Sequence, residues 1–255
     1  MMIKKILFIL IIAAATTALG FTQEETAIVN DVNDMDNIKD KKKLFSIGAG
    51  GFISAALNGG AMGYDIKLQK ADQKESIISN IPLLGGGPYI FLDAAYMEFS
   101  CGYSVSYGKE KTKTVLNGKT KNEVNANLTS INTINLGLLG KYPIAVKKNL
   151  NLFPLLGIDY QMVLFAKRNR VNIKSDVRDL TSLWVKAGAG ADLLITQNLY
   201  LRAEALYGAR LQNKAEKDTI KDLKNIFEKA GIHNNEVKSL LTHGPTIRLA
   251  AGYMF

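Results

Sequence analysis

The sequence predicts an all-β protein with eight antiparallel strands. Three observations support this fold class: apolar residues recur at every second position in eight segments, the links between these segments alternate between short and long, and the chain ends on such a segment. Because side chains two residues apart in a strand point to the same side, each segment has one apolar face and one polar face. Many segments exceed the roughly 5–6 residues usual in soluble sheets.

The first four strands are expected at Leu44–Asn58, Pro88–Ala95, Tyr96–Lys109 and Leu128–Lys141. The other four are expected at Leu150–Ala166, Ser182–Thr196, Leu199–Leu211 and Gly244–Phe255. The third alternates most clearly, since Ser104 and Ser106 separate Tyr103, Val105 and Tyr107. Most of these segments reach the ~9–11 residues that a strand needs to cross a bilayer.

The last expected strand continues to the end of the chain. Its apolar face carries Ile247, Leu249, Ala251, Tyr253 and Phe255. Terminal residues of soluble domains tend to fray, so an alternating strand that ends on an aromatic residue is unusual there. The ending resembles the closing strand of bacterial outer-membrane β-barrels. That resemblance implies that Tyr253 and Phe255 form the C-terminal signal read by the barrel-assembly machinery.

The links between the strands fall into two classes. Those after the second, fourth and sixth strands are short, near residues 93–96, 146–149 and 197–198. Those after the first, third, fifth and seventh are long, near residues 59–87, 110–127, 167–181 and 212–243. Short turns at one rim and long polar loops at the other are typical of up-and-down outer-membrane barrels. With an even number of strands, both termini lie at the periplasmic rim and the four long loops are extracellular.

The last long loop contains an expected short helix, near Ala215–Ala230. Its apolar side comprises Ile220, Leu223, Ile226 and Phe227. Gly231 suits the end of the helix. Two hypotheses follow: the helix folds over the barrel mouth as a lid, or it presents its apolar stripe to a partner or to lipid.

The start of the chain is typical of a secretory signal peptide. Two lysines precede a short apolar stretch, and small residues predict cleavage after Gly20. Residues 21–43 are polar and of mixed charge, which predicts a flexible periplasmic tail. The expected organisation is therefore a signal peptide at 1–20, a tail at 21–43 and a barrel at 44–255. The single cysteine, Cys101, excludes an intramolecular disulfide.

From Leu44 to Phe255 the chain resembles the small eight-stranded outer-membrane barrels, of which the membrane domain of OmpA and OmpX are familiar members. The resemblance rests on architecture rather than on a long shared motif. It implies a transmembrane barrel in the outer membrane of a Gram-negative bacterium. The peptidoglycan-binding domain that follows the barrel in OmpA is expected to be absent.

The polar faces of the expected strands carry charged residues. They are Glu98, Asp159, Lys186, Asp192, Arg202, Glu204 and Arg248. An Arg or Lys that faces lipid near the bilayer centre costs about 2–4 kcal/mol, so these side chains are expected to point inward and to pair with one another. An eight-stranded barrel is only wide enough for its own side chains, which predicts a plugged lumen. The alternative is a small gated pore or a proton path.

An enzyme is the less favoured hypothesis. Both histidines, His233 and His243, fall in the last loop, and His243 would lie near the outer rim, where outer-membrane hydrolases and acyltransferases act on lipid. Ser182 and Asp179 are candidate partners, but their spacing identifies neither a triad nor a dyad. Two histidines without cysteines form no metal motif. No catalytic, metal-binding or cofactor-binding residue is therefore predicted.

These observations predict a structural or surface-interaction role, such as adhesion, carried by long basic loops. The net charge of +9 fits contact with outer-membrane lipids or with other anionic polymers at the cell surface. It also allows an extracellular partner at the loops, whereas export disfavours nucleic acid. The alternatives are a lipid-modifying enzyme that uses His243, a small pore, and a lipocalin-like soluble barrel whose apolar faces surround a ligand.

Overall fold

The computed structural model describes residues 45–56, 64–70, 73–94, 96–168, 171–172, 181–212, 214–232, 235–239 and 241–255. The predicted signal peptide at 1–20, its cleavage after Gly20 and the predicted tail at 21–43 lie outside the described residues. Asp179 and His233 also lie outside them.

Thirteen strands in the described chain form a single antiparallel sheet. In chain order the elements are β1 (Phe45–Ala56), β2 (Tyr64–Lys70), β3 (Gln73–Asn80), β4 (Leu83–Ala94), β5 (Met97–Leu116), β6 (Lys119–Lys141), β7 (Ile144–Lys147), β8 (Leu150–Arg168), β9 (Val171–Asn172), β10 (Ser182–Leu194), β11 (Leu199–Arg210), α2 (Lys214–Lys229), β12 (Glu236–Ser239) and β13 (His243–Met254). The sequence predicted eight strands in all. The segments predicted as links contain β2, β3, β9 and β12, and the link predicted near 146–149 overlaps β7.

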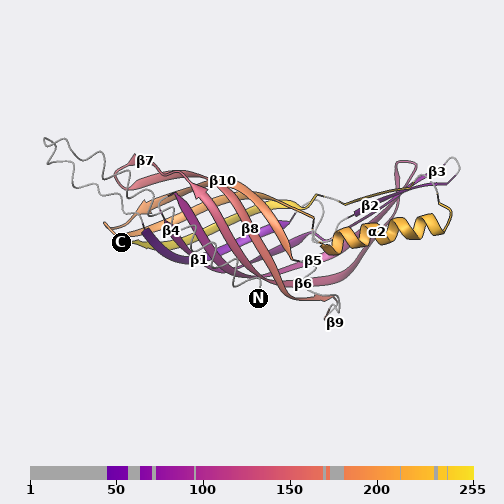
Figure 1. Cartoon of the computed structure of the whole chain (residues 1–255), viewed down its shortest axis with the longest axis horizontal. Helices are drawn as coiled ribbons and strands as arrows, with labels where there is room; N and C mark the ends of the chain where they lie inside the picture. Colours follow the sequence, from indigo (N-terminus) through magenta and orange to yellow (C-terminus); the bar gives the residue numbers. More distant parts are fainter. Residues whose placement is uncertain are drawn as a thin grey trace.

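The pairings close part of this sheet into a ring, here called the barrel. Each strand pairs with the next in the order β1, β4, β5, β6, β8, β10, β11, β13, and β13 pairs back with β1. Figure 1 shows these strands side by side at a common tilt. The closing strand β13 is held from both sides, since Tyr253 lies opposite Ile47 of β1 and opposite Leu199 of β11. A closed sheet has no unpaired edge.

The barrel points its charged side chains inward and exposes rows of apolar side chains on its outer surface. Leu84, Leu156 and Leu249 lie on its outer surface and are 66%, 64% and 62% exposed. Glu98 and Phe153 lie inside and are 0% and 1% exposed. The lipocalin-like alternative requires the apolar rows to point inward, so the structure does not support it.

Two glycines make room for aromatic rings inside the barrel. A Cβ atom on Gly48 would lie 2.3 Å from Cζ of Phe91, and one on Gly190 would lie 2.3 Å from Cε2 of Phe153. Contacts this short force either the ring or the backbone to move. Glycine is therefore required at positions 48 and 190 by the large rings that these positions face.

Beyond one end of the barrel the sheet continues as an arm, which comprises β2, β3, β12 and the outer parts of β5 and β6. Its strand order is β12, β2, β3, β5, β6. The β5–β6 hairpin closes at Asn117 and Gly118, which have φ values of 48° and 79°. Asn-Gly is the sequence most favoured for a two-residue hairpin turn with positive φ. The expectation of long polar loops at 59–87 and 110–127 was therefore wrong, because the described residues of both segments extend the sheet.

Helix α2 lies alongside the arm, beyond the end of the barrel (Figure 1). Near its start, Glu216 accepts a hydrogen bond of 3.0 Å from Nη2 of Arg210, at the outer end of β11. The helix contacts β12, where Val237 lies opposite Ile66 of β2 and both are buried. The helix thus runs outward from the mouth and does not fold across it as the lid hypothesis required. Among the described residues, no helix is long and apolar enough to cross a membrane.

We expect Gly190→Val to lower the stability of the barrel by roughly 1–3 kcal/mol, because the new methyl groups overlap the ring of Phe153. The measurement is the midpoint of urea unfolding in phospholipid vesicles. Gly140→Val is the matched control, since a Cβ there meets nothing closer than an oxygen of Leu156 at 3.5 Å. Equal midpoints for the two variants would contradict this account of the packing.

Candidate functional site

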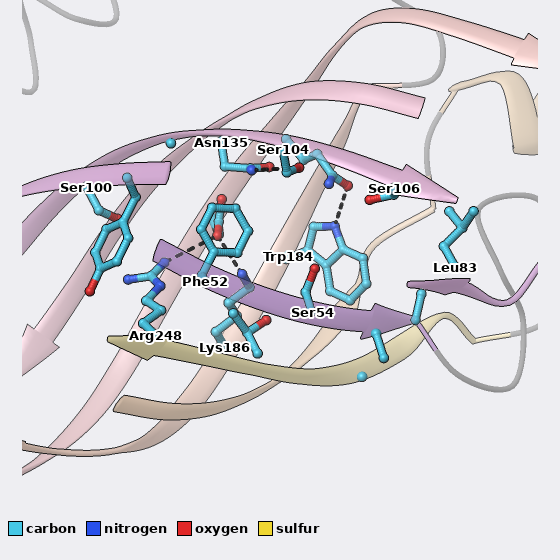
Figure 2. Close-up of a pocket in the computed structure, with 18 residues that line it drawn as sticks. Phe52, Ser54, Leu83, Ser100, Ser104, Ser106, Asn135, Trp184, Lys186 and Arg248 are labelled. Carbon is cyan, nitrogen blue, oxygen red and sulfur yellow. Dashed lines mark hydrogen bonds and ion pairs between the residues drawn. The ribbon is translucent and has the colours of Figure 1, made fainter. Parts of the chain in front are cut away.

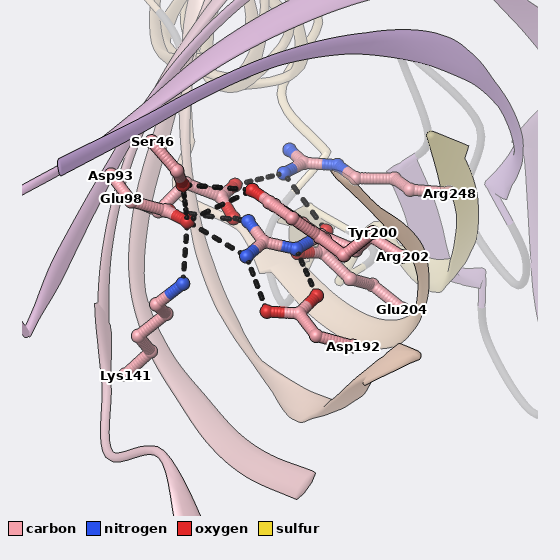
Figure 3. Close-up of polar contacts among 9 residues, drawn as sticks. All are labelled: Ser46, Asp93, Glu98, Lys141, Asp192, Tyr200, Arg202, Glu204 and Arg248. Carbon is pink, nitrogen blue, oxygen red and sulfur yellow. Dashed lines mark hydrogen bonds and ion pairs between the residues drawn. The ribbon is translucent and has the colours of Figure 1, made fainter. Parts of the chain in front are cut away.

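The interior of the barrel, or lumen, has two levels along its axis. A polar cavity occupies the half next to the arm, since Ser54 and Ser106 among its lining residues lie toward the arm ends of β1 and β5; Figure 2 shows the residues that line it. A network of charged side chains occupies the half next to the short turns, where Asp93 and Lys141 lie at the ends of β4 and β6; Figure 3 shows its contacts. Both levels are built from inward positions of the barrel strands, so the alternation that makes the outside apolar also determines which side chains line the lumen.

The seven charged residues that the sequence places on inward faces lie together in this lumen. Five of them, Glu98, Asp159, Arg202, Glu204 and Arg248, are buried. The side chains of Lys186 and Asp192 retain only 12% and 14% exposure. Ion pairs connect all seven into one network.

Arg202 is the centre of the network. Its guanidinium donates bidentate hydrogen bonds to Asp192 at 2.7 and 2.8 Å and to Asp93 at 2.7 and 3.1 Å. A further bond of 2.9 Å reaches Glu98. The ring of Phe91 lies over the guanidinium at 4.3 Å. Arginine suits this position because its planar fork meets carboxylates in pairs while its flat face stacks on an aromatic ring.

Two charged residues of this network were not among the predicted ones. Nζ of Lys141 lies 2.6 Å from Oδ2 of Asp93, and both side chains are buried. Ser46 also donates to Oδ2 of Asp93, and its oxygen lies 2.8 Å from the hydroxyl of Tyr200. The sequence predicted Asp93 where the strand Pro88–Ala95 overlaps the short link near 93–96, and Lys141 at a strand end. The sequence feature that could have identified them is the one that identified the other seven, because each is a charged residue at an inward position of a strand.

Arg248 links the charged network to the cavity. Its guanidinium lies 3.0 Å from Glu98, 3.5 Å from Glu204 and 3.7 Å from Asp159. Asp159 in turn accepts a bond of 2.6 Å from Lys186. Removing one partner from a buried group of charges leaves the others uncompensated, which typically costs 3–5 kcal/mol. The network therefore holds opposite walls of the lumen together.

The cavity next to the arm, here called the outer cavity, holds a volume of about 80 Å³ that water-sized molecules can occupy. Where it meets the charged network it is lined by Asp159, Lys186 and Arg248, here called its floor. Its walls carry hydroxyl, amide and aromatic groups, among them Trp184, whose Nε1 donates a 3.1 Å hydrogen bond to Gln161 (Figure 2). The sequence analysis did not predict this cavity, because the small polar residues that form it carry no motif.

The residues considered for catalysis do not come together. The hydroxyl of Tyr207 and Nδ1 of His243 form a hydrogen bond on the outer surface, where the side chain of Tyr207 is exposed. Ser182 is buried on the inner side and donates to Gln161 at 3.5 Å. His243 and Ser182 thus lie on opposite faces of the sheet. Within the described residues, no three His, Cys, Asp or Glu side chains are grouped to hold a metal ion.

Tyr253 and Phe255 lie on the outer surface at the short-turn end of the barrel. Their rings meet edge to face at a centroid distance of 5.4 Å. Nδ2 of Asn198 donates to the Tyr253 hydroxyl at 3.1 Å and to the carbonyl of Met254 at 3.0 Å. The last residues of the chain are therefore fastened to the neighbouring turn. Their role as an assembly signal stays a prediction.

No protein-family model matches this chain, and neither does any curated protein. Among solved structures, the outer membrane protein OprG from Pseudomonas aeruginosa covers 83% of this chain and 95% of its own, at 11% identity and a TM-score of 0.37. Neisserial surface protein A covers 82% of this chain and 99% of its own, at 11% identity and a TM-score of 0.35. The outer membrane protease OmpT from Escherichia coli covers 82% of this chain and 97% of its own, at 9% identity and a TM-score of 0.28. TM-scores this low carry no argument about function.

We expect Arg202→Leu to destabilise the folded barrel by about 3–5 kcal/mol, because Asp93, Asp192 and Glu98 would lose their shared cation. Urea unfolding in vesicles measures the loss. Lys147→Leu, which removes an exposed cation from β7, is the control and should leave the midpoint within about 0.5 kcal/mol. A similar small effect for both variants would contradict the central role of Arg202.

Proposed function

We propose that this chain is an integral outer-membrane β-barrel of the OmpA and OmpX kind, with a lumen sealed by ion pairs and an extracellular arm that contacts anionic polymers at the cell surface. Export through residues 1–20, assembly through the C-terminal signal at Tyr253 and Phe255, and contact with outer-membrane lipids belong to this proposal. The arm would serve adhesion or ligand contact. The barrel would serve as its anchor.

One row of side chains along β5 carries the proposal. Within the barrel its outward positions are Tyr103, Val105 and Tyr107, and the two tyrosines are exposed. The next outward positions, Lys109, Lys111 and Lys113, are exposed lysines in the arm. Tyrosine is favoured at the membrane interface, whereas lysine avoids the hydrocarbon. The change from an outward tyrosine at position 107 to an outward lysine at position 109 therefore supports a membrane boundary at the base of the arm.

The same face of the arm is basic. By register it carries Lys67, Lys74, Lys109, Lys111, Lys113 and Lys238, against Glu123 and Glu236 among the residues whose side chains are described. The pairs Lys113–Glu123 at 3.4 Å and Lys67–Glu236 at 3.3 Å are both exposed. Exposed pairs of this kind contribute little to stability. Their lysines remain available to a polyanion, and the excess of positive charge would speed its approach.

Three alternatives receive less support. The network around Arg202 fills the lumen level that a small pore would need to keep open. The enzyme hypothesis requires His243 near a nucleophile, but His243 lies beside Tyr207 on the outer surface. The lipocalin-like barrel requires the opposite orientation of the apolar rows.

We expect the double variant Lys109→Glu, Lys111→Glu to bind dextran sulfate about tenfold more weakly than the unmodified protein, because it reverses the charge at the base of the basic face. Binding is measured in detergent micelles at two salt concentrations, since an electrostatic contact weakens with salt. Lys147→Glu, Lys148→Glu is the matched control, because both lysines are exposed at the opposite rim. If the two double variants lose equal affinity for dextran sulfate, or if neither loses any, the arm does not carry the contact with polyanions.

We expect Leu249→Lys to destabilise the barrel by about 2–4 kcal/mol in phospholipid vesicles, because this outward position of β13 faces lipid in the proposal. Ile78→Lys on the arm is the control, because that position would face water. Both variants are compared by urea unfolding. If Leu249→Lys costs no more than its control, the membrane-spanning orientation is wrong.

A further inference from the structure

The outer cavity has the composition of a binding site for a small uncharged molecule rich in hydroxyl groups. Serines from two different barrel strands reach it, Ser54 from β1 and Ser100, Ser104 and Ser106 from β5 (Figure 2). Each hydroxyl can donate one hydrogen bond and accept others. A cavity needs only about 10–15 Å³ of such volume to hold one water molecule. The outer cavity, at about 80 Å³, is large enough for a small organic molecule.

The amide groups of the walls are held in fixed orientations. Gln161 accepts the 3.1 Å bond from Trp184, and its Nε2 donates to Thr133 at 3.5 Å. Nδ2 of Asn135 donates to Ser104 at 3.3 Å. Groups that are already oriented lose little conformational freedom when a ligand binds, which favours binding.

The charges of the floor favour a neutral ligand. Lys186 and Arg248 both lie against Asp159, and Arg248 also pairs with Glu98 and Glu204. These cations already have carboxylate partners, so an anionic ligand would have to compete with them. Aromatic surface is present as well, in Trp184 and Phe52. A ligand that carries both C–H and hydroxyl groups would match these walls, because the walls combine aromatic rings with hydroxyl and amide groups.

We infer that the outer cavity binds a small neutral polyhydroxylated molecule, such as a polyol or a monosaccharide. This inference is independent of the basic face of the arm. A free polyol and the terminal sugar of a surface glycan would present the same hydroxyl chemistry, so the experiment has to distinguish these two sources.

The chain offers its own reporter for binding, because Trp184 is its single tryptophan and lines the outer cavity. The full chain, folded in a detergent without a sugar headgroup, is titrated with glycerol, D-glucose and maltotriose while tryptophan emission is recorded. We expect a saturable change with glycerol or glucose. A saturable change with maltotriose as well would identify the end of a glycan as an acceptable ligand. The absence of a saturable change with all three would overturn the inference.

Ser54→Ala and Tyr200→Phe form a matched pair that tests the site itself. Ser54→Ala removes a hydroxyl that lines the outer cavity, so it should weaken polyol binding roughly fivefold. Tyr200→Phe removes a hydroxyl that bonds Ser46 in the charged network, so it should lower stability and leave polyol affinity unchanged. Equal polyol affinity for both variants would contradict the role of the cavity serines in binding.

Discussion

In a closed antiparallel sheet every side chain of a strand points either into the lumen or away from it, and the rest of this structure depends on that constraint. An open sheet could leave a charged row in water, but a barrel encloses its inner row. Each inward charge must therefore find a partner inside the lumen. Arg202 of β11 reaches Asp93 of β4 and Glu98 of β5, and Arg248 of β13 also reaches Glu98. None of these strand pairs are neighbours in the barrel, so the ion pairs connect walls that backbone hydrogen bonds leave separate.

Side-chain length explains why the two levels of the lumen differ. Near the short turns, long arginine and glutamate side chains and the rings of Phe91, Phe153 and Tyr200 fill the cross-section. Nearer the arm, Ser54, Ser104 and Ser106 project only a short distance from the walls and leave the outer cavity between them. In the first level the buried charges have partners of opposite sign, and removing one partner would leave the others uncompensated. In the second level the hydroxyl of Tyr89 and Oδ1 of Asp159 have no hydrogen-bond partner in the described protein, which is a cost to stability.

The arm is a continuation of the barrel wall rather than a separate loop structure. On β5 the outward row passes from Tyr107 to Lys109 without a break in alternation, and the inward row continues toward the face where Ile66 and Val237 are buried beside α2. The two faces of one sheet thus change surroundings together at the end of the barrel. On the outward face, exposed apolar side chains in the barrel are followed by exposed lysines in the arm. On the inward face, side chains that line the lumen are followed by side chains near α2, and Glu216 of this helix pairs with Arg210.

The local pattern of residues was sufficient to predict the barrel strands and the direction of their side chains, because a period of two is a property of each strand alone. It located the central strands to within a few residues and placed Arg202 and Glu98 on inward faces. It did not find the arm, since β3 and the outer parts of β5 and β6 carry polar residues on both faces and β2, although it alternates, is only seven residues long. Register, the partners of each charge, the inclusion of Asp93 and Lys141, and the outer cavity were settled only by the tertiary structure. These features depend on which side chains meet across a closed ring, and that depends on residues far apart in the chain.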